Sequence, residues 1–199
     1  MENKSASALF STRSLAKIAI LGALAGALMY LEFVIPPFPT FYKLDFSDIP
    51  ALLGAFAMGP AEGVLIEAVK IFIKFLIKPT STLGIGELAN FTVGCALVLP
   101  AGMIYKRNKT RKTALIGMAA GTLIMTLIGA AFNYFVLIPV YAKAFGMEAI
   151  LGMASAIAGI KDLGTLVVFG TIPFNLIKGV IVSVITILLY KKVSPLLHR

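Results

Sequence analysis

The sequence has a single cysteine, a single histidine and no tryptophan in 199 residues. One cysteine cannot form an intrachain disulfide or a CxxC metal site, and Cys95 lies inside an apolar run, where we expect a small buried side chain. The only histidine is His198, which excludes an HExxH zinc site and acid catalysis by histidine elsewhere in the chain. We therefore predict neither a metal site nor a cofactor.

Catalytic and nucleotide-binding patterns are also missing. The sequence contains no Gly-Lys dipeptide, so it has no GxxxxGK[ST] loop for binding ATP. The nine acidic residues do not place two carboxylates, or a nucleophile with a base, together in one apolar run. We expect a protein that is not an enzyme.

Charge is scarce and apolar residues dominate. Only 14% of the residues are charged, 59% are hydrophobic and the mean hydropathy is +0.95, which is typical of an integral membrane protein. The 18 basic residues give a net charge of +9, but many of them form short clusters beside apolar runs, one of them at 106–112. Such clusters are typical of cytoplasmic loops and not of a nucleic-acid surface. We predict one polytopic domain over residues 1–199, in contact with lipid and not with nucleic acid.

The apolar runs set the number of membrane spans. A helix that crosses a hydrocarbon core of about 30 Å needs about 20 apolar residues. The runs are 15–36, 49–77, 86–105, 113–142 and 169–190. Five spans would put the basic clusters on opposite sides of the membrane, against the charge rule.

The run 49–77 resolves this conflict, because Met58-Gly59-Pro60 interrupts it and proline disfavours a continuous helix. Splitting the run gives a short second helix, 49–58, and a third, 60–77. We predict an all-α cell-membrane protein with six transmembrane helices and both termini in the cytoplasm. The segments 37–48 and 143–168 then lie outside, the second with a short interfacial helix.

The segment after the first helix is rich in proline, aromatic and acidic residues. Its aromatic residues are Phe38, Phe41, Tyr42 and Phe46. They alternate with polar residues such as Thr40 and Asp45, a mixture suited to an extracellular gating loop that closes over a flat ligand with polar edges. An aromatic belt at the membrane interface would have a similar composition, and the pattern leaves both interpretations open.

Polar residues inside the apolar runs gather at the predicted outer end. They are Glu32, Glu87, Asn90, Asn133, Asn175 and Lys178. Intramembrane polar groups are costly, so their shared depth favours a capped, outward-facing binding pocket. Alternatively, each asparagine bonds to neighbouring backbone and Lys178 reaches the interface. On the third helix, Glu67, Lys70, Lys74 and Lys78 predict a salt-bridged face turned to water or protein.

The first helix carries a stripe of small residues, Ala19, Ala23 and Ala27. Small residues four apart let a second helix approach closely. The stripe could contact a partner subunit or pack inside the bundle, and the sequence does not separate these.

Four motifs resemble one family in the same order along the chain. They are Leu44-Asp-Phe-Ser-Asp-Ile-Pro50, Met58-Gly-Pro60, Gly86-Glu-Leu-Ala-Asn-Phe91 and Pro173-Phe-Asn-Leu-Ile-Lys-Gly179. Together they resemble the riboflavin-specific substrate-binding S component of energy-coupling factor (ECF) transporters. The resemblance implies a six-helix membrane protein that captures riboflavin from outside. It would hand the vitamin to a module of one transmembrane coupling subunit and two ATPases, which use the ATP.

The resemblance also implies roles for residues. The loop after the first helix gates the pocket, the Pro-Phe-Asn-Leu-Ile-Lys motif places Asn175 and Lys178 at the vitamin, and the alanine stripe contacts the coupling subunit. The predicted substrate-binding residues are Thr40, Leu44, Glu87, Asn133, Asn175 and Lys178. Two alternatives stay open: an S component for another vitamin, and a channel or ion-coupled carrier that works alone.

Overall fold

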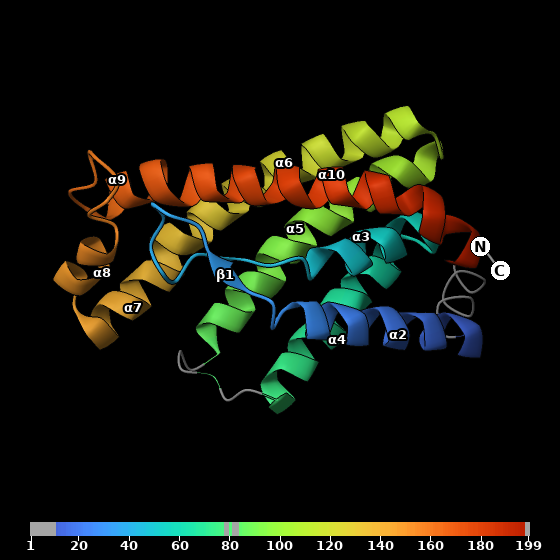
Figure 1. The fold of residues 1–199 in the computed structure, drawn as a ribbon, viewed down its shortest axis with the longest axis horizontal. Helices are drawn as coiled ribbons and strands as arrows, with labels where there is room; N and C mark the ends of the chain where they lie inside the picture. Colours follow the sequence, from blue (N-terminus) through green and yellow to red (C-terminus); the bar gives the residue numbers. More distant parts are fainter. Residues whose placement is uncertain (1–10, 78–79, 81–83, 198–199) are drawn as a thin grey trace.

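A computed structural model describes residues 11–77, 80 and 84–197 of the chain. Lys78, which the sequence places on the third helix, lies outside the described residues, as do Lys4 and His198. The described part is mostly helical, and its long helices pack side by side into a bundle (Figure 1).

The helices follow the predicted apolar runs. They are α2 (Thr12–Leu28), α3 (Asp48–Ala57), α4 (Pro60–Ile77), α5 (Ile85–Arg107), α6 (Arg111–Phe132), α7 (Ile138–Phe145), α8 (Met147–Met153), α9 (Leu163–Leu166) and α10 (Ile172–Leu197). Two π-helical segments, η1 (Asn133–Leu137) and η2 (Val167–Thr171), join α6 to α7 and α9 to α10. The α8 helix lies within the predicted outer loop, 143–168, where the sequence predicts a short interfacial helix around 148–158.

The first helix is shorter than the apolar run predicts. It ends at Leu28, and a two-stranded antiparallel ribbon follows, in which β1 (Phe33–Val34) pairs with β2 (Lys43–Leu44). Three prolines lie between the strands, and proline cannot donate the backbone bonds that a continuing helix needs. Hydropathy alone could not place this end, because residues 29–36 at the start of the loop continue the apolar run. The ribbon is a local exception to the all-α prediction.

The predicted break between the second and third helices is present. Gly59 has a φ of +149°, a backbone conformation that favours glycine, and Pro60 is the first residue of α4. The short α3 helix is buried over Asp48–Phe56. Its neighbours α2, α4, α5 and α10 enclose it, as a helix too short to cross a bilayer requires.

Helix starts are fixed by capping side chains. The Ser11 hydroxyl accepts the backbone N–H of Ser14 at 3.2 Å and begins α2. Thr110 and Thr113 form a reciprocal capping box at the start of α6, and Asp162 and Thr165 do the same for α9. These caps satisfy backbone donors that have no partner inside the helix.

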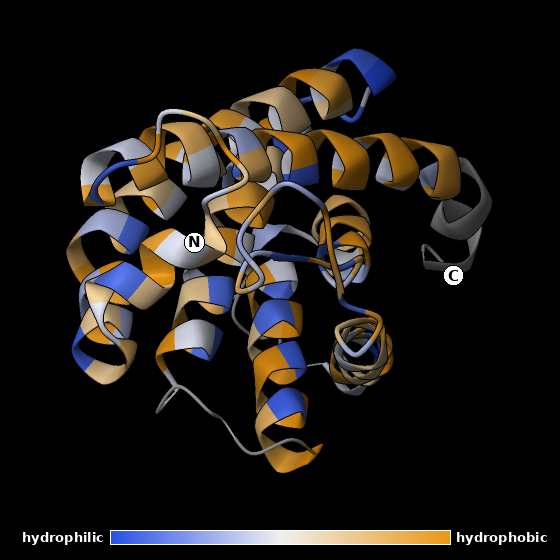
Figure 2. Cartoon of the chain, turned by 60° about the vertical axis from the view of Figure 1, so that its left-hand side comes forward, coloured by the Kyte–Doolittle hydropathy of each residue, from blue (hydrophilic) through white to orange (hydrophobic). Residues whose placement is uncertain are grey.

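Three continuous helical stretches of the described chain are long and apolar enough to cross a membrane. They are Ile85–Arg107, Arg111–Phe145 and Leu163–Tyr190. Figure 2 shows hydrophobic residues along much of the long helices, and many large hydrophobic side chains are exposed, as lipid contact requires. The structure thus supports a membrane protein, and the count of six spans stays a prediction.

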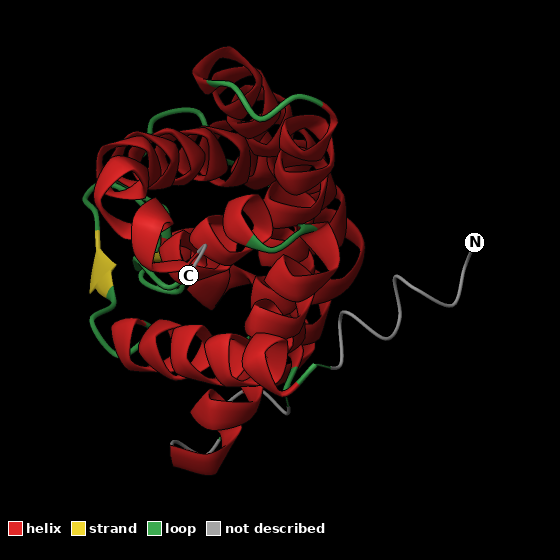
Figure 3. Ribbon diagram, turned by 90° about the vertical axis from the view of Figure 1, so that its right-hand side faces the viewer, coloured by secondary structure: helices red, strands yellow, loops and turns green. Residues whose placement is uncertain are grey.

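The ends of the bundle differ in character. The start of α2, the segment 106–112 and the end of α10 lie at one end, the right-hand side of Figure 1 and the near side of Figure 3. We call this the basic end, because Arg13, Lys17 and the five basic residues of 106–112 lie there. The ribbon, α7 and α8 lie toward the opposite end, which we call the loop end.

Candidate functional site

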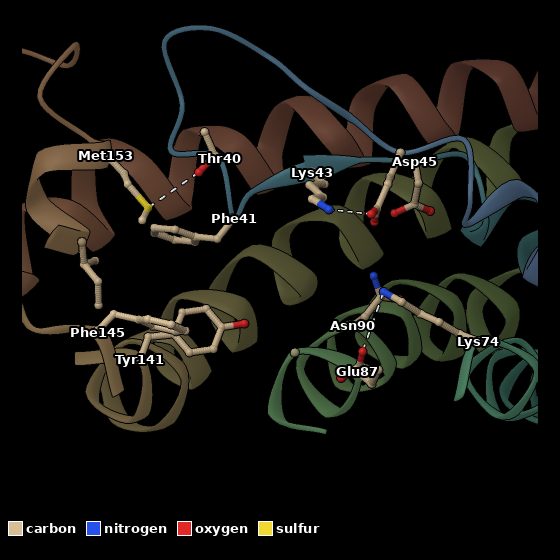
Figure 4. A pocket seen from close by; sticks show the side chains of 13 residues that line it. Thr40, Phe41, Lys43, Asp45, Lys74, Glu87, Asn90, Tyr141, Phe145 and Met153 are labelled. Carbon is tan, nitrogen blue, oxygen red and sulfur yellow. Dashed lines mark hydrogen bonds and ion pairs between the residues drawn. The ribbon is translucent and has the colours of Figure 1, made fainter. Parts of the chain in front are cut away.

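A cavity of about 370 Å³ opens at the loop end. Its walls come from the segment between α2 and α3, the end of α4, the start of α5, and α7 and α8 (Figure 4). The lining residues are Glu32, Thr40, Phe41, Lys43, Asp45, Lys74, Gly86, Glu87, Asn90, Tyr141, Phe145, Ile150 and Met153. The cavity lies within the size range of pockets that hold small molecules and cofactors.

One half of the cavity is aromatic and apolar. Phe41 faces Tyr141 edge-on with ring centroids 6.0 Å apart, and Tyr141 faces Phe145 in the same way at 6.2 Å. The Thr40 hydroxyl donates a weak hydrogen bond to Sδ of Met153 at 3.6 Å, which joins the loop to α8. These side chains offer flat, polarisable surfaces of the kind that bury an aromatic ring.

The other half is polar and charged. Lys43 forms an ion pair with Glu32, and Lys74 lies 4.0 Å from Glu87. Glu87 also accepts the Thr80 hydroxyl at 2.9 Å. The side-chain oxygen of Asn90 is buried and has no hydrogen-bond partner among the described residues. A buried amide oxygen without a partner is costly, so Asn90 is an acceptor available to a ligand donor.

A cluster of buried charges lies beside the polar half. Lys178 on α10 contacts Asp45 and Asp48 at 3.1 Å each, and Lys70 on α4 contacts Asp48 at 2.7 Å and also pairs with Glu67. Two ammonium groups thus face three carboxylates. Lys70 and Glu67 are 0% exposed and Lys178 is 4% exposed.

This charge cluster decides between interpretations that the sequence left open. Lys178 does not extend to the interface, because two carboxylates hold it inside the bundle. The Glu67 and Lys70 side of α4 faces α3 and protein, not water, because Asp48 at the first turn of α3 supplies the counter-charge. Breaking one partner out of such a buried pair leaves an uncompensated charge.

The charge cluster also anchors the loop. Asp45 accepts the backbone N–H of Ser47 at 2.9 Å and the Ser47 hydroxyl, and its other oxygen accepts Lys178. The segment just before α3 is therefore tied to α10 across the bundle. Around the tip, the Thr40 hydroxyl contacts Met153, Phe38 packs against Phe174 and Phe41 packs against Tyr141.

The two predicted asparagines bond to their own helices. The Asn133 amide donates to the Gly129 carbonyl at 2.8 Å, and the Asn175 amide donates to the Thr171 carbonyl at 2.9 Å. This is the backbone-bonded arrangement that the sequence left open as an alternative. Each amide oxygen remains able to accept a further hydrogen bond.

Tyr42 of the loop covers this pair. Its hydroxyl donates to the Asn133 oxygen at 3.2 Å and forms a hydrogen bond with Thr171. Its ring stacks on Phe174 with centroids 5.2 Å apart and planes 21° apart. Burial raises the pKa of Tyr42, so the hydroxyl stays protonated and can donate. Asn133, Asn175 and Lys178 do not line the cavity; Asn133 bonds to Tyr42 and Lys178 bonds to Asp45.

Each asparagine lies next to a π-helical segment. Asn133 begins η1, and Thr171, which Asn175 bonds, ends η2. Pro139 and Pro173 follow the two segments within two residues. Because proline has no N–H and its ring clashes with the carbonyl four residues earlier, the helix widens just before it. Such widened turns recur at functional sites, and here they mark the two helices that carry the asparagines.

The remaining predicted site residues divide in two. Thr40 and Glu87 line the cavity, whereas Leu44 is buried in β2 and does not. In the loop, Phe41 lines the cavity, Phe38 packs edge-on against Phe174 at 5.5 Å, and Phe46 packs against Phe33 at 5.9 Å. The aromatic residues thus form the loop's own packing as well as the cavity wall.

The alanine stripe lies on the outer face of α2. Ala19, Ala23 and Ala27 are exposed, whereas Gly22 and Gly26 on the adjoining face are buried. A side chain at Gly22 would collide with Val69, and one at Gly26 would lie 2.7 Å from Ile73. The glycines therefore mediate packing of α2 on α4, and the alanines are not needed for it.

Comparison with known proteins identifies relatives along nearly the whole chain. The family described as "ECF transporter, substrate-specific component" matches residues 13–190. The chain is 35% identical to the riboflavin transporter RibU of Staphylococcus aureus over 94% of this chain and 93% of that protein. It is 30% identical to the riboflavin transporter FmnP of Bacillus subtilis over 94% and 95%, respectively.

A solved structure shares the fold. It is reported under "Structure and mechanism of the S component of a bacterial ECF transporter" and is 34% identical. The two superpose with a TM-score of 0.73 over 93% of this chain and 97% of that chain. The similarity in fold therefore extends over nearly the whole of both chains.

Proposed function

The chain belongs to the family of ECF transporter substrate-specific components, and from this membership we propose that it captures riboflavin and delivers it for ATP-driven uptake. The observation that carries the proposal is full-length similarity to two proteins named riboflavin transporters. Members of this family are transport components and not enzymes.

The two halves of the cavity match the two parts of riboflavin. The isoalloxazine ring is flat, and the rings of Phe41, Tyr141 and Phe145 offer surfaces for its faces. The ribityl chain carries hydroxyl groups, and Thr40, Glu87 and the unpartnered oxygen of Asn90 offer it polar partners. Burial of the ring supplies most of the affinity, and the polar contacts fix its orientation.

We assign the polar edge of the ring to Asn133 and Asn175. Both amides hold a fixed rotamer through a backbone bond, which leaves their oxygens directed for a ligand N–H. Riboflavin reaches them when Tyr42 leaves Asn133, so binding is coupled to movement of the loop tip. Lys178 forms ion pairs with Asp45 and Asp48 at the base of the loop. We also propose that its ammonium group contacts the bound vitamin.

The proposed partners are a transmembrane coupling subunit and two ATPases. The chain has no phosphate-binding loop of its own, so ATP is hydrolysed by the partners. The exposed stripe of Ala19, Ala23 and Ala27 is the surface that we assign to the coupling subunit, since small residues allow a partner helix to approach closely.

The proposed topology places the basic end in the cytoplasm. The start of α2, the segment 106–112 and the end of α10 share this end, in accord with the positive-inside rule. The six spans of this cell-membrane protein are then α2, α3, α4, α5, α6 and α10. The cavity opens outward.

Uptake in cells tests the function. Labelled riboflavin should accumulate when this chain is expressed together with an ECF energising module, and not when either is expressed alone. Excess unlabelled riboflavin should compete, while thiamine, biotin and folate at equal concentration should not. Competition by one of those vitamins instead would assign the chain to another substrate. Uptake without the energising module would favour a carrier that works alone.

A further inference from the structure

A second cavity, of about 200 Å³, lies at the basic end, far from the loop-end cavity along the bundle. Its walls come from α3, α5, α6 and α10. The lining residues are Phe56, Tyr105, Lys109, Thr110, Arg111, Ala114, Met118, Ile187 and Tyr190. None of these residues takes part in the proposed riboflavin site, so this cavity needs an explanation of its own.

The interior of this cavity is apolar and aromatic. Phe56 packs against Tyr105 at 4.7 Å and against Tyr190 at 5.8 Å between ring centroids. The two tyrosine hydroxyls bond to each other at 2.7 Å, so their polar groups are satisfied within the wall. Ala114 and Met118 are buried and complete the wall on α6. A hydrocarbon chain fits such a lining better than a polar ligand does.

The mouth of the cavity is cationic. Lys109 and Arg111 flank Thr110 there, all three exposed, and 106–112 contains five basic residues and no acidic one. Neither Lys109 nor Arg111 forms an ion pair with another residue in the described part of the chain. Two cations at the rim of an apolar cavity, at the end of membrane-length helices, lie at the depth of lipid headgroups.

We propose that this cavity binds an anionic phospholipid, with an acyl chain among Phe56, Tyr105 and Tyr190 and the phosphate at Lys109 and Arg111. The apolar wall distinguishes this occupant from a free anion, which would use only the mouth. The lipid would fill the space where α3, α5 and α10 meet, and so brace the short α3 helix at the end remote from the loop. The proposal does not depend on the identity of the transported vitamin.

Native mass spectrometry of the full chain tests the site with defined lipids. The protein, released from detergent micelles containing phosphatidylglycerol or phosphatidylcholine, should retain one phosphatidylglycerol about tenfold more than phosphatidylcholine, as expected for two headgroup contacts. Lys109→Gln with Arg111→Gln should abolish this preference. The matched control, Lys106→Gln with Lys112→Gln, makes the same charge change in the same segment but outside the mouth, and should keep it.

A further variant separates the acyl chain from the headgroup. Ala114→Leu narrows the apolar wall and should lower retention of phosphatidylglycerol, while riboflavin binding at the other end reports that the protein is folded. Added inorganic phosphate should not displace the lipid. Equal loss in both double variants would indicate diffuse charge attraction, equal retention of the two lipids would show that the anionic headgroup is not recognised, and displacement by phosphate would indicate a free-anion site. Each of these results would overturn the proposal.

Discussion

The hydrogen bond between Tyr42 and Asn133 allows a direct test of access to the proposed binding site. The asparagine was predicted from its depth in an apolar run, and its oxygen accepts a hydrogen bond from Tyr42 of the loop. Tyr42→Phe removes the hydroxyl and leaves that oxygen without this partner. We expect riboflavin to bind more tightly by about 1 kcal/mol, because the ligand no longer competes with the loop. Fluorescence titration measures this, and a weaker affinity would mean that the hydroxyl contacts the bound vitamin.

Asn175 tests the polar edge of the site. Asn175→Ala should weaken riboflavin binding by roughly 1–3 kcal/mol, because a polar edge of the ligand is buried without its partner. Folding should change little, since the amide bonds only a carbonyl of its own helix. Thr186→Ala is the matched control: Thr186 is buried on the same helix and bonds the carbonyl of Val182 at 2.8 Å, but we assign it no contact with riboflavin. Equal effects of the two substitutions on affinity would remove Asn175 from the site.

Lys178 behaves differently, because it belongs to the charge cluster. Lys178→Met leaves Asp45 and Asp48 short of a counter-charge in the interior, and should cost about 3–5 kcal/mol of folding stability. Thermal unfolding in detergent measures this loss. Adding Asp45→Asn should restore part of it, since one unpaired charge is removed. A Lys178→Met protein as stable as the parent would show that the cluster contributes no net stability.

The sequence could reveal individual residues only in part. Depth in apolar runs predicted Glu87, Asn133, Asn175 and Lys178 as site residues, and of these Glu87 lines the cavity. It could not find the pairing of Lys178 with Asp45 and Asp48, because that contact joins residues far apart in the chain. Asn90 was grouped by depth, but its lack of a partner is visible only in three dimensions. The signal that was available for the charge cluster was the spacing of Asp45 and Asp48 around the start of an apolar helix.

At the scale of elements, α2 presents two faces of small residues with different tasks. The sequence predicted the alanine stripe but not whether it faces the bundle or a partner, because small residues lie on several faces of the helix. The structure buries Gly22 and Gly26 against α4 and leaves Ala19, Ala23 and Ala27 exposed. Gly22 and Gly26 thus allow α2 to pack closely inside the bundle. This favours the interpretation that the exposed alanines contact a partner subunit.

Substitution on this helix should separate binding from transport. Leucine at Ala19, Ala23 or Ala27 should abolish uptake in cells that carry the energising module, because a branched side chain holds a partner helix away. Riboflavin binding by the purified protein should stay within twofold, a change of about 0.4 kcal/mol or less.

Ala119→Leu on the exposed face of α6 makes the same change on another helix and should leave uptake intact. Gly22→Leu, by contrast, should destabilise the fold, since it collides with Val69. Loss of binding and uptake together in the alanine variants would place the partner surface elsewhere.

Other elements were predictable where a residue imposes a backbone constraint. The Gly59-Pro60 pair located the break between α3 and α4 because both residues disfavour a continuing helix. The end of α2 was misplaced because β1 pairs with β2, a contact that hydropathy does not encode. The widened turns η1 and η2 were missed, although Pro139 and Pro173 inside apolar runs were a usable signal.

For the molecule as a whole, the two ends of the bundle carry separate functions in this account. The loop end holds the vitamin cavity, with the charge cluster behind it, and the basic end holds the second cavity. Charge clustering along the sequence predicted which segments share an end, and the path of the helices agrees with that grouping. The shape of either cavity could not be predicted, because each is formed by segments from several parts of the chain.

The central claim is that this chain alone forms the riboflavin site. Titration of the purified protein with riboflavin, followed by quenching of flavin fluorescence and without nucleotide or partner subunits, tests it most directly. The account predicts saturable binding of one riboflavin per chain below micromolar concentration, about −8 kcal/mol or better, and weaker binding to the Asn175→Ala variant. Absence of binding at micromolar riboflavin in a folded preparation would contradict it.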